Sequence, residues 1–302
     1  MNQYSKLFIS VLFSFICVTT LFAQDKKKNF TLPEIPSTIQ TVNERASFLA
    51  THYWDNFSFT DSLQFMNQPD EIEQAVVDYI DIFRLIPLEE AEKSISDLMD
   101  KSSVTLNGFL FFYNTFERYL YDVSSPMRNE QYFIPVLEKL IASKKLSEDD
   151  KIRPTMLLTS ANKNRIGTTA ADFKYTKADG SQILLSESPT EWTILIFFDP
   201  ECDVCHMAIQ ELEKDTMLGQ LIEEKQLSIV AVYPGPKSSM WKTMQGAMSK
   251  NWEIGYDKED AVYSKELYDL LGFPTIYLLD KDKKVLQKDS SPKKIHDFFK
   301  KD

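Results

Sequence analysis

The sequence predicts a two-domain α+β protein, in which an N-terminal all-α helical domain is followed by a C-terminal α/β domain. Up to about Lys163, apolar residues recur at the 3.6-residue spacing of amphipathic helices. The pattern breaks over 164–169, and short apolar runs typical of buried strands then alternate with helical segments. The 302 residues are enough for two domains of about 150 residues each. We place these domains at 24–165 and 166–302, after a leader at 1–23.

The leader has the layout of a secretory signal peptide. Lys6 supplies a weak positive charge, residues 7–22 form an almost unbroken apolar run, and Ala23 is a small residue at the expected cleavage point. The alternative is a retained anchor, although the run is short for a membrane span of ~20 residues. We therefore expect an exported protein of the periplasm or cell envelope, tethered to the membrane if the signal is not cleaved.

Five segments of the first domain each carry one apolar face, which predicts five helices. Their ranges are 71–85, 88–99, 104–121, 130–141 and 147–159. Ser147 is a suitable N-cap because acidic residues follow it in the first turn. The aromatic stripes of these segments could line a ligand groove, but core packing is the better interpretation. His52 has no cysteine or second histidine nearby, so we interpret it as a hydrogen-bonded structural residue.

The second domain alternates strands and helices. Polar turns at 178–180 and 280–283 separate pairs of short strands, and two continuous apolar runs predict strands buried on both faces. The expected strands are 173–176, 183–185, 193–198, 227–233, 275–279 and 285–287. The expected helices are 202–221, 239–248, 261–271 and 292–300.

The charge excludes two classes of function. The chain has 34 Lys and Arg against 45 Asp and Glu, which gives a formal net charge of −11 at pH 7. Such an acidic protein repels phosphate backbones and anionic lipids. We therefore expect no nucleic-acid partner and no peripheral binding to membranes.

Cys202 and Cys205 are the two cysteines that remain once the leader is removed. A disulfide between them closes too small a loop to constrain a fold, so reversible redox chemistry is a stronger interpretation than a structural bridge. Cys202 follows a predicted buried strand and begins a helix, where free N–H groups and the helix dipole stabilise a thiolate. Cys205 lies one turn further along and can resolve a mixed disulfide.

A second motif, Gly-Phe-Pro-Thr at 272–275, precedes the strand predicted at 275–279. Together with the C-x-x-C motif, it resembles the thioredoxin superfamily, in particular exported thiol–disulfide oxidoreductases of the TlpA and ResA type. The resemblance covers about 170–300 and implies a thioredoxin fold that needs no cofactor. It also implies that Pro274 is cis and catalytic beside the two cysteines, and that Phe273 and Thr275 bind an extended substrate peptide.

The resemblance further implies the partners of such a protein. These are disulfide-containing protein substrates and a membrane-linked thiol reductant. The first domain resembles an uncharacterised domain found ahead of thioredoxin-like modules in exported bacterial proteins, on the residues 52–55 and 125–130. That resemblance implies no activity, and we expect the domain either to recruit a partner or to shield the C-x-x-C motif.

Three residues depart from the patterns of the superfamily. Glu201 stands for a tryptophan, Ile196 for a buried acid, and Ala208 for a glutamate of the exported members. No inherited general base is therefore available to Cys205. Asp199 or Glu201 could serve, although acidic loop residues are usually only solvated. With Asp203 they place negative charge around Cys202, which disfavours a thiolate and favours the disulfide. Our hypothesis is therefore a reductase or isomerase rather than a strong oxidase.

The same residues also allow other interpretations. His206, one turn after Cys202, either tunes the thiolate or is simply exposed. The run 202–206 also spells C-x-x-C-H, the attachment motif of a c-type haem electron carrier, but the preceding strand and the Phe-Pro-Thr sequence favour thiol chemistry. A peroxiredoxin would carry threonine in place of Asp199, and a zinc site lacks ligands, so we expect no metal. A redox-inert thioredoxin-fold binding protein is the third alternative.

Overall fold

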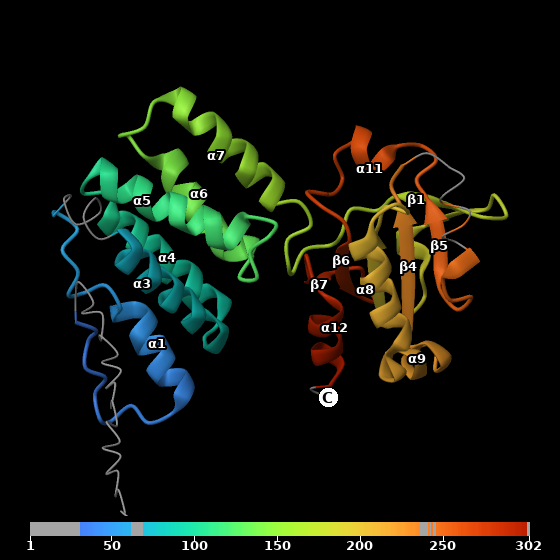
Figure 1. Ribbon diagram of the computed structural model, residues 1–302, viewed down its shortest axis with the longest axis horizontal. Coiled ribbons are helices and arrows are strands. Elements are labelled where there is room, and N and C mark those ends of the chain that lie inside the picture. Colours follow the sequence, from blue (N-terminus) through green and yellow to red (C-terminus); the bar gives the residue numbers. More distant parts are fainter. Residues whose placement is uncertain (1–30, 62–68, 236–240, 242, 244–245, 301–302) are drawn as a thin grey trace, which may run out of the picture.

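The computed structural model describes residues 31–61, 69–235, 241, 243 and 246–300, so the predicted signal peptide at 1–23 lies outside it. Figure 1 shows a domain built of helices, blue to green, beside a domain built around a sheet, yellow to red. The predicted fold class is therefore confirmed. Among the described residues, no helix combines the length and the apolar character that a membrane crossing requires.

Within the described residues, the first domain consists of α-helices joined by short turns. Its helices are α1 (Val42–His52), α3 (Pro69–Ile82), α4 (Leu88–Ser102), α5 (Leu106–Phe116), α6 (Glu130–Ala142) and α7 (Glu148–Ala161). A 3-10 turn, η1 (Phe83–Leu85), extends α3, and a π-helical turn, η2 (Glu117–Tyr121), extends α5. The hydroxyl of the predicted N-cap Ser147 accepts a hydrogen bond from the Asp150 N–H, and the Asp150 carboxylate accepts one from the Ser147 N–H.

Aromatic side chains fill the core of the helical domain. The ring of Trp54 meets those of Phe57, Tyr79 and Phe112 edge to face, with centroids 5.2–5.7 Å apart. All four residues are buried, which fits the core packing that the aromatic stripes predict. His52 Nδ1 lies 2.7 Å from the Asp55 carboxylate, as a structural histidine would.

The second domain is built on one mixed sheet of seven strands within the described residues. The strands are β1 (Lys174–Lys177), β2 (Gln182–Leu184), β3 (Trp192–Phe197), β4 (Leu227–Tyr233), β5 (Glu253–Tyr256), β6 (Thr275–Asp280) and β7 (Val285–Gln287). Their order is β2-β1-β5-β4-β3-β6-β7, with β3, β4 and β5 parallel and the other neighbours antiparallel. Alternate residues of the central strand β3 enter two different cores, so β3 is buried on both faces as predicted.

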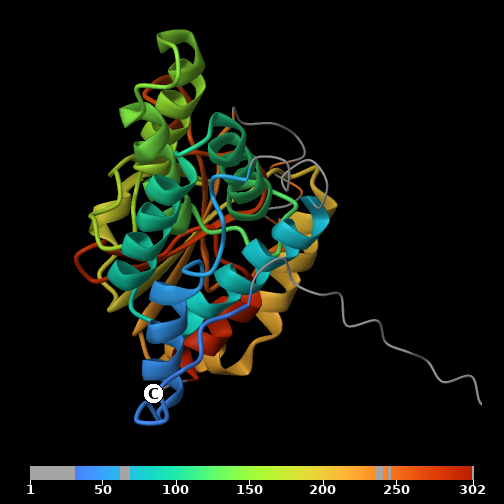
Figure 2. The same cartoon turned by 90° about the vertical axis from the view of Figure 1, so that its left-hand side faces the viewer.

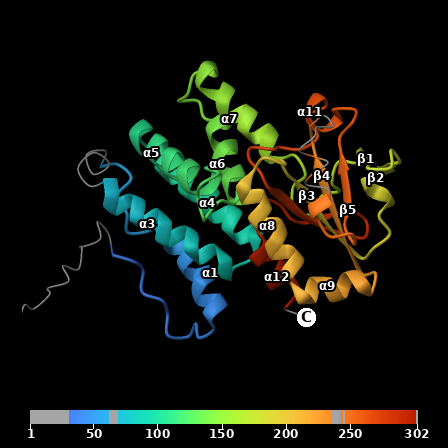
Figure 3. The same cartoon turned by 45° about the vertical axis from the view of Figure 1, so that its right-hand side comes forward.

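Helices cover one face of this sheet. They are α8 (Asp203–Lys214), α9 (Thr216–Glu223) and α12 (Pro292–Phe299), and Figure 3 shows α8 and α12 on the same side of the strands. Cys205, Ile209 and Ile295 pack between these helices and the sheet. The short α11 (Ala261–Ser264) and the loop after it pack on the other face, where Val262 and Tyr268 join the core.

The single helix predicted at 202–221 is wrong. The helix breaks at Asp215, whose carboxylate accepts the N–H groups of Met217 and Leu218 and so starts α9. The other carboxylate oxygen lies 2.7 Å from His296 Nδ1 on α12. Asp215 therefore acts as a cap and as a link between helices, and capping overrides the continuous apolar spacing.

Helix α1 is not among the five helices predicted for the first domain, and two further elements of the second domain differ from the prediction. The helix predicted at 261–271 ends at Ser264, because Glu266 adopts a left-handed conformation (φ 49°) that turns the following residues into the core. Strand β5 was not predicted, because it is short and contains Gly255. A Cβ on Gly255 would lie 2.6 Å from the Tyr175 ring, so the close approach of β1 requires glycine there. The helix predicted at 239–248 lies partly outside the described residues, and its described positions 241, 243 and 246–247 are helical.

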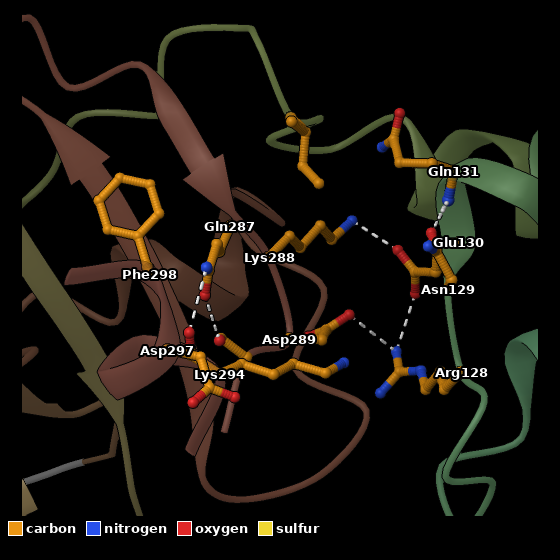
Figure 4. Close-up of a pocket in the computed structure, with 12 residues that line it drawn as sticks. Arg128, Asn129, Glu130, Gln131, Gln287, Lys288, Asp289, Lys294, Asp297 and Phe298 are labelled. Carbon is orange, nitrogen blue, oxygen red and sulfur yellow. Dashed lines mark hydrogen bonds and ion pairs between the residues drawn. The ribbon is translucent and has the colours of Figure 1, made fainter. Parts of the chain in front are cut away.

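The two domains meet along a seam of buried charged groups. Lys288 Nζ lies 2.6 Å from a Glu130 carboxylate oxygen and donates to the Lys163 carbonyl at 2.8 Å. Arg128 contacts Glu130 at 2.8 Å and Asp289 at 3.2 Å (Figure 4). Burial and the neighbouring Glu130 raise the pKa of Asp289 to about 6. Figure 2 shows the helical domain lying in front of the sheet domain.

Candidate active site

The register of the sheet brings the two sequence motifs together. Strand β3 ends at Phe197 and β6 begins at Thr275, and these two residues are paired in the antiparallel ladder. The chain leaving β3 and the chain entering β6 therefore lie at the same edge of the sheet. As a result, the Cys202 sulfur is 3.6 Å from the carbonyl oxygen of Phe273, 71 residues later. The Phe273–Pro274 peptide bond is cis.

Cys202 is the N-cap of α8. Its Sγ accepts a hydrogen bond from the Cys205 N–H at 3.2 Å, so a free N–H group of the helix terminus points at the sulfur and stabilises negative charge there. A turn at 199–202 positions Cys202 at the start of the helix. The Asp199 carbonyl accepts a hydrogen bond from the Cys202 N–H, and the Asp199 carboxylate accepts one from the Glu201 N–H. The side chain of Cys202 is partly exposed, so a substrate disulfide can reach it.

Cys205 has the opposite environment. Its side chain is fully buried, and burial is the largest of the causes that raise its pKa to about 12. A hydrogen bond to Cys202 and the charges of Cys202 and Asp199 raise it further, while a backbone hydrogen bond from Asp199 acts the other way. Cys205 therefore stays protonated at neutral pH. One partly exposed and one buried sulfur suit the roles of attacking and resolving thiol.

The residues proposed for tuning lie close to this pair. His206 Nε2 donates to the Pro200 carbonyl at 2.9 Å, so this nitrogen is bonded to the backbone rather than to sulfur. Burial, and after it the charges of Asp199 and Glu201, raises the pKa of Tyr233. A general-base role for either acid stays a prediction.

The loop before β6 is closed by Thr275. Its hydroxyl donates to the Gly272 carbonyl at 2.7 Å, and the side chain is buried. The hydroxyl thus holds the turn that carries Phe273 and Pro274. Both of these residues are partly exposed, and substrate binding by them stays a prediction.

The geometry does not fit covalent haem. Attachment through C-x-x-C-H needs both sulfurs within reach of the haem edge and the histidine free as an axial ligand. Cys205 has no exposed surface, and His206 Nε2 is engaged by Pro200. In the part of the chain that the structure describes, no three His, Cys, Asp or Glu residues gather as a metal site.

A cavity beside the cis-proline is lined by both domains, which sequence reasoning missed. It has a volume of about 340 Å³ and lies between the loop 123–128 of the helical domain and the loop 272–275. Lys294, at the start of α12, completes its wall. The run 125–130 is distinctive in the sequence, but nothing in its composition points to the cysteines, and the tertiary structure alone places it there.

The fold and the paired cysteines define a thioredoxin-like protein. A crystal structure of a thioredoxin-like protein from Bacteroides caccae is 40% identical, covers 90% of this chain and 98% of that chain, and superposes with a TM-score of 0.86. The chain belongs to this family of thioredoxin-like proteins. Its particular architecture is a domain of unknown function (DUF5106), matched over residues 16–164, followed by an AhpC/TSA family domain, matched over 166–288. The thioredoxin-like resemblance drawn from the two motifs is therefore confirmed.

Other solved structures cover less than half of this chain. The C-terminal domain of an uncharacterized protein from Bacteroides fragilis is 38% identical, covers 45% of this chain and 97% of that chain, and has a TM-score of 0.44. The thioredoxin domain of a thiol-disulfide oxidoreductase from Bacteroides vulgatus is 20% identical over 45% of this chain and 96% of that chain, with a TM-score of 0.41. No curated protein matches the chain.

Proposed function

We propose that the protein is an exported thiol–disulfide oxidoreductase that reduces or isomerises disulfides of cell-envelope proteins. One observation carries the proposal. The partly exposed Cys202 sulfur caps a helix, lies against the carbonyl before a cis-proline, and accepts a hydrogen bond from the buried Cys205. This arrangement supports a nucleophile and a resolving thiol in one helical turn. Membership of the thioredoxin-like family supports it further.

The reaction proceeds in two exchanges. The Cys202 thiolate attacks one sulfur of a substrate disulfide, which forms a mixed disulfide and releases the other substrate sulfur as a thiolate. Cys205 then loses its proton and attacks the Cys202 sulfur, which releases the second substrate thiol. Two electrons pass to the substrate, and the Cys202–Cys205 pair is left as a disulfide. In isomerisation the substrate's own thiol attacks the mixed disulfide instead.

The oxidised pair must be reduced again after each turnover. For an exported protein, we propose a membrane-linked dithiol donor. The acidic residues near Cys202 support a reducing couple, because negative charge disfavours its thiolate relative to the disulfide. A measured reduction potential of about −120 mV, the value of a strong oxidant, would contradict this direction of electron flow.

Trapping tests the activity and identifies the substrate. In Cys205→Ala the second exchange is blocked, so we expect mixed disulfides with Cys202 to accumulate. Addition of dithiothreitol should cleave them. Cys202→Ala is the matched control and should trap nothing, because Cys205 is buried. If Cys205→Ala traps no species and the reduced wild type reduces no disulfide, the protein is instead a redox-inert binding protein.

A further inference from the structure

The groove beside the cis-proline is built by both domains, and this decides what it can bind. On one side lie Phe273 and Pro274, whose backbone adjoins the reactive sulfur. On the other side lies the loop 123–128 of the helical domain, with Val123 60% exposed. A substrate chain that passes Cys202 and enters this groove therefore contacts the helical domain as well.

The groove continues beyond the cis-proline along the seam between the domains. Its cavity of about 340 Å³ adjoins a second one of about 410 Å³, drawn in Figure 4. The two cavities share four lining residues along the seam between the domains: Arg128, Asp289, Ser290 and Lys294. Together they form a channel that begins at the cis-proline and runs between the domains. Such a shape suits a strand of polypeptide better than a compact small molecule.

The groove beside the cis-proline is lined by two cations, Arg128 and Lys294, and by one carboxylate, Asp289. Arg128 is neutralised by its contacts with Glu130 and Asp289. Lys294 is exposed, and its amine has no ion pair among the residues that the structure describes. Figure 4 shows Lys294 and Arg128 pointing toward each other across the channel.

We propose that the helical domain forms the outer wall of the substrate groove, and that this groove selects an extended protein segment with an acidic side chain near its disulfide cysteine. The proposal rests on the proposed thiol–disulfide exchange and names its substrate class. The carboxylate of the substrate pairs with the Lys294 amine, and the apolar part of the segment packs on Val123. The helical domain is thus a specificity element of the active site.

Two disulfide peptides that differ only in charge test this selection. One carries glutamates beside its cysteines and the other carries lysines at the same positions. The fully reduced protein is mixed with each peptide, and reduced and oxidised peptide are separated by chromatography. Each rate is divided by that of the same variant with bis(hydroxyethyl) disulfide, which is too small to reach Lys294. We expect the wild type to favour the glutamate peptide about threefold, the scale of a partly exposed ion pair.

Variants of Lys294 and Val123 test whether the preference for the glutamate peptide arises in the groove. Lys294→Glu should reverse it, Val123→Glu should weaken it, and Val123→Lys should strengthen it. Lys281→Glu is the matched control, since it makes the same charge change on an exposed turn away from the groove and should leave the preference unchanged.

Three outcomes would overturn the proposal. They are a wild-type preference for the lysine peptide, which the net charge alone would produce, no preference at all, or a glutamate preference that survives Lys294→Glu and Val123→Glu. In each of these cases the small disulfide is still reduced. If the wild type reduces neither peptide nor the small disulfide, the thiol–disulfide exchange itself fails.

Discussion

The burial of Cys205 makes the second exchange strongly dependent on pH. In the reduced protein its pKa is raised from an ordinary value of 9.0 to about 12, so about one molecule in 10⁵ carries the thiolate at pH 7. In the mixed disulfide, Cys202 carries no charge and no thiol, so its share of the rise is lost. Burial, the largest cause, remains, and the pKa of Cys205 stays above 9. Between pH 7 and pH 9 the thiolate fraction, and with it the rate, should rise about 100-fold.

A chromogenic aromatic disulfide such as dithiobis(nitrobenzoate) separates the two steps. Cys202 of the reduced protein releases one thionitrobenzoate and keeps the other as a mixed disulfide, and attack by Cys205 then releases the second. The second phase is intramolecular, so its rate does not depend on the reagent concentration. Cys205→Ala should show the first release only. The rate of the second phase is recorded at half-unit steps from pH 7 to pH 9.

A second phase that changes less than about threefold over this range would refute the reasoning, because Cys205 would then ionise near neutrality despite its burial. Asp199→Asn sharpens the test, since an asparagine oxygen can still accept the Glu201 N–H. The Asp199 charge raises the pKa of Cys205, so its removal should speed the second phase at pH 7. A slower second phase would instead identify Asp199 as the general base.

Two further predictions concern the seam between the domains. Lys288→Met should lower the free energy of unfolding in urea by about 3 kcal/mol, because it leaves the buried Glu130 with only Arg128 as a partner. Lys281→Met, on an exposed turn, is the control. An equal effect of both substitutions would contradict the role of the Lys288–Glu130 pair. Asp289 has its pKa raised from 3.8 to about 6, so the folded state holds this proton more tightly than the unfolded state, and stability falls as the pH rises from about 4 to about 6. Asp289→Asn, which resembles the protonated form, should therefore gain stability relative to the wild type across this window, by about 2–3 kcal/mol. If the stability difference between Asp289→Asn and the wild type is the same at pH 4 and pH 7, Asp289 does not titrate in this way.

Local pattern was enough for most elements. The helical faces of five segments of the first domain and the buried runs at β3 and β4 follow from spacing alone, because each element must bury one face or both. The Ser147 cap was likewise visible, since its partner lies three residues away. Local signals misled where two of them competed: at Asp215 the cap prevailed over the apolar spacing, and after Ser264 a left-handed residue turned the chain into the core.

The sequence by itself determined the two-domain class, the order of most elements, and the two motifs that meet at the candidate site. Those features depend on residues close together in the chain. Only the tertiary structure decided that one cysteine is partly exposed and the other buried, because burial is set by packing against the helices and the sheet. It also decided that the loop 123–128 faces the cis-proline and that Lys294 points into the space between them. The loop 123–128 lies more than a hundred positions before the residues that it faces, and no periodicity or spacing records which surfaces of two domains come into contact.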